Sequence, residues 1–273
     1  MNMIFKCDNF NLDDTFECGQ CFRWNKDDNG VYTGIVEGNV LRLKQTGDSI
    51  DFDGDIAFWK NYFDLDTDYN EIIRKIRIDD VMKNATEKGK GIRILRQNLF
   101  ETVISFIISQ NNNIPRIKGI VEKLCMGFGN KIDGLNYSFP TPESLNSADI
   151  TDFAYLKAGY RDVYIKDAAR FFTEHILDSD ILINGNLSDA RSEISKIKGV
   201  GPKVADCILL FGAYRTEVFP TDVWMKRILS IYYGINNASP AEINAFASKK
   251  FGKYAGFAQQ YLFYLARSEK IGM

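Results

Sequence analysis

Hydrophobic and polar positions alternate with a period of two along roughly the first 55 residues of the chain. Two segments, VYTGIV (31–36) and VLRLKQ (40–45), have the pattern of half-buried strands. DDNG precedes the first segment and EGN separates the two, and both sequences are typical of hairpin turns. The N-terminal part of the chain is therefore predicted to form a small antiparallel sheet.

After Ile56 the hydrophobic positions follow the period of a helix. A short helix is predicted over FWKNYFD (58–64), and a long, mostly apolar helix over residues 91–110. The next predicted helix has Pro115 near its first turn and ends at a glycine. Residues 138–150 are rich in turn residues and predict a loop. Further helices are predicted over residues 161–177, 187–197, 203–214, 221–234, 239–252 and 255–270.

The two patterns predict an α+β protein with two domains. A small antiparallel β-rich domain is expected over residues 1–80, and a larger all-helical domain over residues 81–273. No apolar run reaches the roughly 18 residues that span a membrane, and the start MNMIFKCDNF lacks the features of a secretory signal. We therefore expect a cytosolic or nuclear protein whose five cysteines are reduced.

The charges are unevenly distributed along the chain, although the net charge is only −2. Residues 1–80 carry 9 Lys and Arg against 17 Asp and Glu, whereas residues 81–273 carry 25 against 19. This asymmetry favours contact between the second part and a polyanion such as nucleic acid. Chance variation among solvated surface charges is the alternative.

The segment IKGVGPK (197–203) lies between two predicted helices. Gly199 and Gly201 allow backbone conformations that are closed to other residues, and Pro202 suits the first turn of the second helix. The free N–H groups at the start of that helix form a site for an anion such as a DNA phosphate. An ordinary tight connection between two helices is the alternative.

Lys203 follows this hairpin directly, at a helix N-terminus that disfavours a positive charge. The helix dipole and burial would both favour the neutral amine, which is the only nucleophilic form of a lysine. The side chain could instead serve only as a counter-charge to a phosphate.

Asp222 stands nineteen residues after Lys203 (222 − 203), at the start of the next predicted helix. A carboxylate in this position could stabilise a cationic transition state on a sugar. Thr221 or Asp222 could also act merely as the N-cap of the helix. The hairpin, the lysine and the aspartate at this spacing together favour an enzyme that acts on the sugar of DNA.

The sequence resembles the helix–hairpin–helix DNA glycosylase superfamily and, within it, the 8-oxoguanine DNA glycosylases. The resemblance covers nearly the whole chain and implies the same two-domain fold. It is carried by ECGQCFRW (17–24), residues 91–125 with their triple-asparagine turn, LKAGYRDVYI (156–165), GVGPKVADC (199–207), FPTDVWM (219–225) and YAGFAQQYLF (254–263).

The resemblance implies a glycosylase that is also a lyase at abasic sites. By this likeness Lys203 attacks C1′ of the deoxyribose, expels the damaged base and forms a Schiff base, and Asp222 is its electrostatic partner. Gly199, Gly201 and Val204 match the main-chain donors to phosphate. The resemblance requires no cofactor, and it allows a monovalent cation on the hairpin carbonyls.

The residues that recognise the base are also implied by resemblance. The carbonyl of Gly19 would accept a hydrogen bond from N7–H, which 8-oxoguanine has and guanine lacks. Gln259 would contact the Watson–Crick edge, with Phe263 and Cys207 on the two faces of the base. Lys203 and Cys207 are four residues apart, as are Gln259 and Phe263, so each pair shares a helix face. Phe263 and Cys207 could otherwise be ordinary core residues.

Four further residues match the family's readers of the cytosine opposite the lesion: Asn111, Arg116, Tyr160 and Arg161. By resemblance Asn111 fills the gap left by the extruded base, Tyr160 wedges the stack, and the two arginines donate to cytosine. The implied partner is double-stranded DNA with 8-oxoguanine opposite cytosine. The chain is expected to act as a monomer, without a membrane, in the cytoplasm of a prokaryote at the nucleoid.

Some positions depart from the family's pattern. Trp224 stands where a histidine that contacts phosphate is expected. Cys18 and Cys21 form a C-x-x-C motif, which could indicate redox or zinc chemistry, but no second pair has suitable spacing, so no metal site is expected. The four-cysteine iron–sulfur loop of the endonuclease III relatives is missing. A glycosylase for another lesion, or a non-catalytic helix–hairpin–helix module, remains the alternative.

Overall fold

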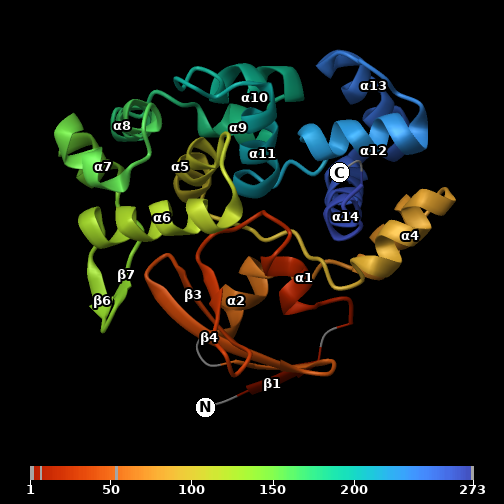
Figure 1. Cartoon of the computed structure of the whole chain (residues 1–273), viewed down its shortest axis with the longest axis horizontal. Coiled ribbons are helices and arrows are strands. Elements are labelled where there is room, and N and C mark those ends of the chain that lie inside the picture. Colours follow the sequence, from red (N-terminus) through yellow and green to blue (C-terminus); the bar gives the residue numbers. More distant parts are fainter. Residues whose placement is uncertain (1–2, 7, 53–54, 272–273) are drawn as a thin grey trace.

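The computed structural model describes residues 3–6, 8–52 and 55–271. Its N-terminal part contains an antiparallel five-stranded sheet in the order β1-β5-β4-β3-β2 (Figure 1). The strands are β1 (Met3–Lys6), β2 (Trp24–Lys26), β3 (Val31–Val36), β4 (Asn39–Thr46) and β5 (Ser49–Phe52). Every second residue of β3 is buried, so the predicted alternation is confirmed.

Two short helices, α1 (Leu12–Phe16) and α2 (Ile56–Tyr62), share a hydrophobic core with the sheet. Aromatic rings fill this core. Trp24 stacks on Phe16 with ring centroids 4.2 Å apart, and its indole N–H donates to the Tyr62 hydroxyl over 3.0 Å. The polar atom of the buried indole is therefore paired, as burial requires.

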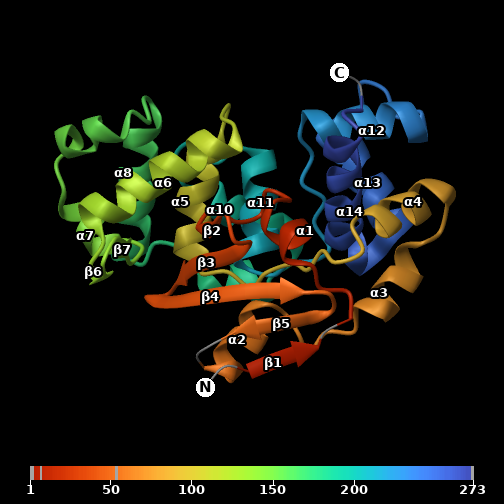
Figure 2. The same ribbon diagram turned by 60° about the horizontal axis from the view of Figure 1, so that its bottom comes forward.

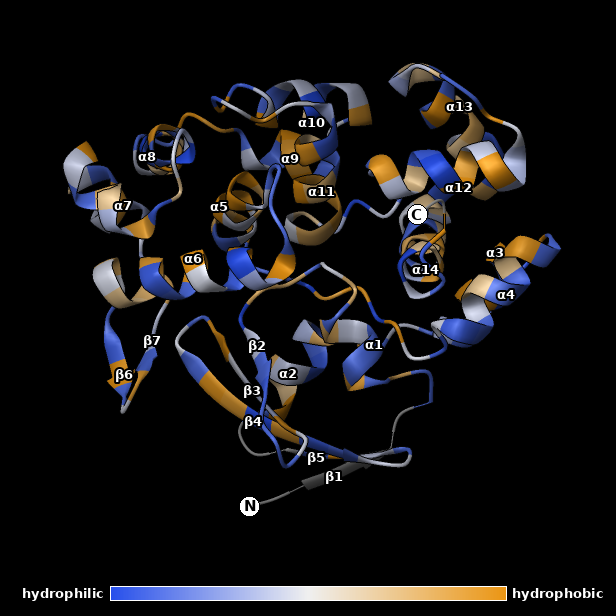
Figure 3. Ribbon diagram, in the orientation of Figure 1, coloured by the Kyte–Doolittle hydropathy of each residue, from blue (hydrophilic) through white to orange (hydrophobic). Residues whose placement is uncertain are grey.

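The remainder of the chain is helical, apart from the small hairpin of β6 (Lys131–Asp133) and β7 (Asn136–Tyr137) (Figures 1 and 2). Hydrophobic residues concentrate on α5 and α11 in its middle (Figure 3). None of the helices among the described residues is long and apolar enough to cross a membrane. The helices and 3₁₀ segments are α3 (Tyr69–Ile76), α4 (Asp80–Lys88), α5 (Leu99–Ser109), α6 (Ile114–Phe128), α7 (Pro142–Ser147), η1 (Ile150–Leu156), α8 (Arg161–Thr173), α9 (Ser179–Asn184), α10 (Leu187–Ile194), α11 (Pro202–Gly212), α12 (Val223–Tyr233), α13 (Pro240–Phe251), η2 (Gly252–Tyr254) and α14 (Ala255–Ser268).

The long helix predicted over residues 91–110 is wrong in its first half, because α5 begins only at Leu99. The preceding segment is extended, and its main chain pairs with the side chain of Gln20. The Gln20 amide donates to the Arg93 carbonyl over 2.7 Å and accepts from the Leu95 N–H over 2.9 Å. These long-range hydrogen bonds replace the helical ones. The hydrophobic pattern alone therefore predicted a helix where the segment is extended.

The predicted loop over residues 138–150 also contains a short helix, α7. Thr141 caps it by accepting a hydrogen bond from the Ser144 N–H over 3.1 Å, and proline occupies its first turn. The same turn-forming residues that predicted a loop therefore begin a helix here.

Candidate active site

The hairpin between α10 and α11 forms as the sequence predicts. Gly199 has φ +86°, and a Cβ there would lie 2.3 Å from the ring of Tyr164, so this position requires glycine. Gly201 is exposed at the N-cap of α11, and no side chain caps that helix. The first N–H groups of α11 are therefore available for an anion.

An ion pair holds the two helices of the hairpin together. Arg191 of α10 contacts Asp206 of α11 through two bonds, of 2.6 and 3.2 Å, and also donates to Asn244 over 3.2 Å. Asp206 is buried, and burial raises the pKa of its carboxyl although Arg191 opposes the shift. The bidentate contact fixes the angle at which α11 leaves the hairpin.

Lys203 lies in the first turn of α11 and lines a cavity of about 50 Å³. Its ammonium nitrogen is 5.5 Å from the centre of the Phe106 ring, which belongs to α5. The cavity has room for only a few water molecules. Its lining consists of Cys18, Gly19, Phe106, Lys203, Cys207, Phe211, Pro220, Asp222, Gln259, Gln260 and Phe263.

Asp222 reaches the same cavity from the start of α12. Its carboxylate caps this helix by accepting the Met225 N–H over 2.9 Å. The capping role considered from the sequence is therefore confirmed. The same side chain also belongs to a residue that lines the cavity, so the two roles are compatible. Capping holds one carboxylate oxygen at the N-terminus of α12.

The base-reading residues expected from the sequence also line this cavity. Gln259 is 5 % exposed, and its buried Oε1 has no hydrogen-bond partner among the described residues. A buried acceptor without a partner is costly, so it indicates a ligand that supplies an N–H group. Burial raises the pKa of the Cys207 thiol to about 11, and nearby Lys203 opposes this shift. The thiol is thus neutral at ordinary pH.

Gly19 contributes main chain to the cavity wall, with φ +80°, and lies beside Phe263 of α14. Hydrogen bonds from α14 hold this N-terminal segment. The Tyr264 hydroxyl donates to Asp14 over 2.6 Å, and Arg267 donates to the Glu17 carbonyl over 3.0 Å. The cavity is therefore built by both parts of the chain.

The four predicted readers of the opposite cytosine lie around two segments that are bonded to each other. Asn111 is exposed in the turn between α5 and α6, with φ +48°. Arg116 donates to the Lys157 carbonyl over 3.3 Å, and Tyr160 is 50 % exposed. The structure thus brings Asn111, Arg116 and Tyr160 near one surface.

Arg161, the fourth of these residues, is 6 % exposed. Its guanidinium donates to the main-chain carbonyls of Ala158 and Gln110, and it packs 4.5 Å from the centre of the Tyr160 ring. Gln110 directly precedes Asn111, so Arg161 positions the turn that carries Asn111. In the described part of the chain, its guanidinium therefore binds main-chain carbonyls and packs on a tyrosine ring.

The two cysteines of the C-x-x-C motif are not joined by a disulfide. Cys18 and Cys21 are both buried free thiols. The Cys18 thiol donates to the Thr15 carbonyl over 3.2 Å, and burial raises its pKa to about 12. No group of three potential metal ligands occurs in the ranges that the structure describes. Cys7 lies outside them.

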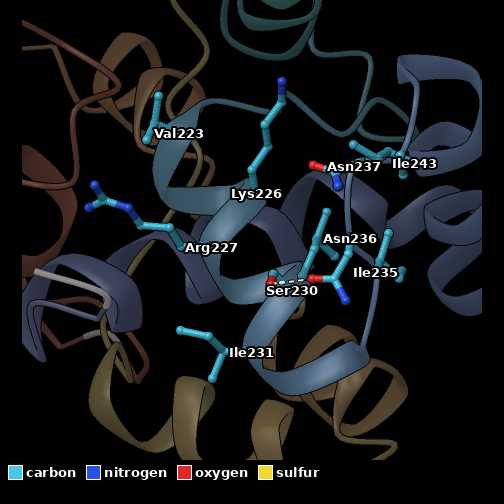
Figure 4. Close-up of a pocket in the computed structure, with 11 residues that line it drawn as sticks. Val223, Lys226, Arg227, Ser230, Ile231, Ile235, Asn236, Asn237 and Ile243 are labelled. Carbon is cyan, nitrogen blue, oxygen red and sulfur yellow. Dashed lines mark hydrogen bonds between the residues drawn. The ribbon is translucent and has the colours of Figure 1, made fainter.

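A larger cavity, of about 480 Å³, runs along α12 and the residues that follow it (Figure 4). Lys226 and Arg227 line it, as does Asn236, which is joined to Ser230 by a hydrogen bond of 2.5 Å. Arg227 also packs 5.1 Å from the centre of the Trp224 ring. A cation thus stands beside the tryptophan that departs from the family's pattern.

Sequence reasoning missed five residues of the Lys203 cavity: Phe106, Phe211, Pro220, Gln260 and Cys18, which it considered only as part of the C-x-x-C motif. Phe106 and Phe211 stack with ring centroids 5.4 Å apart. They come from α5 and α11, whose hydrophobic residues give no signal that separates a pocket wall from the core. Gln260 adjoins Gln259 in the sequence, and this adjacency could have drawn attention to it.

Residues 2–103 match the family described as "8-oxoguanine DNA glycosylase, N-terminal domain", and residues 104–253 match the "HhH-GPD superfamily base excision DNA repair protein". The chain is 32 % identical to an N-glycosylase/DNA lyase of Saccharomyces cerevisiae, over 96 % of this chain and 83 % of that protein. A probable N-glycosylase/DNA lyase of Methanothermobacter thermautotrophicus is also 32 % identical, over 75 % of this chain and 72 % of that protein.

A solved structure of the Clostridium acetobutylicum 8-oxoguanine glycosylase/lyase, in complex with DNA that has cytosine opposite 8-oxoguanine, is also similar. It is 38 % identical with a TM-score of 0.92, covering 99 % of each chain. The expected fold is confirmed by this likeness. The chain therefore belongs to the 8-oxoguanine DNA glycosylase family, the N-glycosylase/DNA lyases of the helix–hairpin–helix superfamily.

Proposed function

We propose that this protein excises 8-oxoguanine from double-stranded DNA, with cytosine as the preferred opposite base, and then cleaves the strand. One observation carries the proposal: Lys203, Asp222 and the main chain of Gly19 line a single cavity in which a buried Gln259 oxygen lacks a partner. An amine, a carboxylate and unpaired recognition groups in one place suit attack on the sugar of an extruded base.

In the proposed reaction the Lys203 amine forms a bond to C1′ of the deoxyribose. The bond from C1′ to N9 breaks, and its electron pair leaves with the base, which takes up a proton. The nitrogen then loses one proton, the bond from C1′ to O4′ breaks, and O4′ takes up a proton. The nitrogen keeps its other proton, so the product is a protonated Schiff base. Loss of a proton from C2′ then expels the 3′ phosphate by elimination.

Asp222 would stabilise the positive charge that develops on the sugar. Its carboxylate is held at the helix N-terminus by the bond to Met225, so it needs little reorganisation during the reaction. The uncapped N–H groups after Gly201 would hold a phosphate of the same strand. No cofactor enters this scheme, and a monovalent cation on the hairpin carbonyls would only steady the phosphate contact.

Selection of the damaged base would depend on the Gly19 carbonyl. 8-Oxoguanine carries a proton on N7, whereas guanine has a lone pair there that would repel a carbonyl oxygen. Exposed Asn111 and Tyr160 would fill the gap beside the orphaned cytosine, with Arg116 as the accessible cation. One copy of the chain would act on each lesion, at the nucleoid of a prokaryotic cell.

Trapping with borohydride tests the proposal. The protein is incubated with duplexes that carry 8-oxoguanine opposite each of the four bases, and the covalent adduct is measured by gel electrophoresis. We expect most adduct opposite cytosine and none with Lys203→Gln. Lys75→Gln, which changes an exposed lysine of α3, is the matched control.

An adduct that persists in Lys203→Gln would assign the nucleophile to another residue. Equal release of undamaged guanine would contradict the role of Gly19. Equal adduct opposite all four bases would contradict the cytosine preference alone.

A further inference from the structure

Gln260, next to Gln259 on α14, is a second buried amide in the Lys203 cavity. It is 2 % exposed. No hydrogen bond joins its side-chain amide to any residue in the part of the chain that the structure describes. Neither atom of this amide is among the fully enclosed side-chain atoms that lack a partner, so the amide retains contact with open space, and the space that Gln260 lines is the cavity. The hydrogen bonds of the fold therefore do not account for an amide at this position.

The cavity wall that Gln260 shares contains both apolar residues and the polar residues Lys203, Asp222 and Gln259. Phe211 and Pro220 line the cavity with it. One turn earlier on the same helix, Gly256 packs so closely that a Cβ there would lie 2.4 Å from Leu210. The amide is therefore explained best by a polar ligand that enters the cavity.

Successive side chains of a helix point about 100° apart, so Gln259 and Gln260 would contact different groups of one ligand. The unpaired atom of Gln259 is an acceptor, Oε1, which suits the N–H groups of a guanine edge. The neighbouring O6 of the same edge is an acceptor and needs a donor.

From this arrangement we infer that Gln260 is a second specificity-determining residue, whose amide N–H donates to O6 of the extruded base. The inference rests on the proposed function. A donor at this position selects a 6-keto purine. An adenine-type base carries an amino group there, and two donors would then face each other.

The test is Gln260→Leu, which keeps the volume and removes the amide. Single-turnover excision of 8-oxoguanine should slow about tenfold, as expected for one lost hydrogen bond in a closed site. Cleavage of a preformed abasic site should change less than about twofold, because no base is present to be read. Gln260→Glu, which replaces the amide donors with a carboxylate, should match Gln260→Leu.

Binding provides the second measurement, with Lys203→Gln as the background that prevents turnover. We compare duplexes that contain 8-oxoguanine, 8-oxohypoxanthine, 8-oxoadenine or a tetrahydrofuran abasic analogue. Gln260→Leu should weaken binding of both 6-keto bases about tenfold and leave the abasic duplex unchanged, so that the preference over 8-oxoadenine falls. Lys75→Gln, at an exposed position of α3, is the control.

Equal slowing on 8-oxoguanine and abasic DNA would show a merely structural role and overturn the inference. An unchanged preference over 8-oxoadenine would also overturn it. Failure of the unsubstituted protein to release 8-oxoguanine would instead overturn the proposed function. The two failures are therefore distinguishable.

Discussion

Asp222 illustrates how one side chain serves both the fold and the site. Its carboxylate caps α12 through Met225, and it also lines the cavity beside Lys203. Capping needs only an acceptor oxygen, which asparagine supplies equally well. Stabilising a cationic sugar needs the negative charge. The two roles can therefore be separated by a single substitution.

Asp222→Asn should keep the stability of the protein and lose activity. The free energy of unfolding should change by only a few tenths of a kcal/mol, while single-turnover excision falls about 10²- to 10³-fold. Asp222→Ala should lose a similar amount of activity and also about 1 kcal/mol of stability. Urea unfolding and single-turnover kinetics on the same samples provide the measurements. Full activity in Asp222→Asn would limit this residue to capping.

At the scale of single residues, the sequence predicted most of the cavity. The predicted catalytic and base-reading residues all line it: Lys203, Asp222, Gly19, Cys207, Gln259 and Phe263. Phe106 was missed because its contact with Lys203 joins helices far apart in the sequence. The buried state of Arg161 was missed because its partners are main-chain carbonyls, which no sequence pattern marks.

At the scale of elements, the predicted strands and helices match the observed ones where the local pattern and the long-range contacts favour the same structure. The strands β3 and β4 lie where alternation predicts them. The segment before α5 differs because Gln20 binds its main chain. Apolar residues in a row fit either a buried helix or a buried extended segment, and only the distant partner decides.

Glu101, in the first turn of α5, has surroundings that disfavour the charged form of its carboxyl. Glu101 lies 3.8 Å from Arg23 of the N-terminal part. Burial raises the pKa of Glu101 to about 7, nearby Glu37 adds to the shift, and Arg23 opposes it. Between about pH 4.5 and 7 the folded protein therefore holds a proton that the unfolded chain has lost. Stability from this group must fall as pH rises through that interval.

Glu101→Gln should remove this pH dependence. Relative to the unsubstituted protein, the variant should gain on the order of 1 kcal/mol in the free energy of unfolding between pH 5 and pH 8. Urea unfolding at the two pH values measures this difference, in which other titrating groups cancel. A constant offset between the two proteins would show that Glu101 titrates in its ordinary range.

At the scale of the whole molecule, two cations of the positively charged second part of the chain lie in the larger cavity along α12. Asp222 begins this helix in the Lys203 cavity, and Lys226 and Arg227 follow it into the larger cavity (Figure 4). Neither cation forms an ion pair with another residue in the described ranges. A strand of DNA leaving the Lys203 cavity would meet them.

Lys226→Gln should weaken the binding of lesion-bearing and undamaged duplexes to the same extent. A phosphate contact carries no sequence information, and its loss should reduce the slope of log affinity against log salt concentration by about 1. Fluorescence anisotropy over roughly 50 to 200 mM salt measures the slope, with Lys75→Gln as the control. An unchanged slope would place the DNA away from the larger cavity.

One wall of the Lys203 cavity is main chain, because Gly19 has no side chain to contribute. A point mutation can remove an amine or a carboxylate, but every replacement at this site retains a peptide oxygen. Damage to this wall must therefore come from displacement, through the φ +80° conformation or the bonds from Tyr264 and Arg267. Loss of discrimination between oxidised and intact purines should accordingly arise from substitutions around the segment that holds this oxygen, rather than by its deletion.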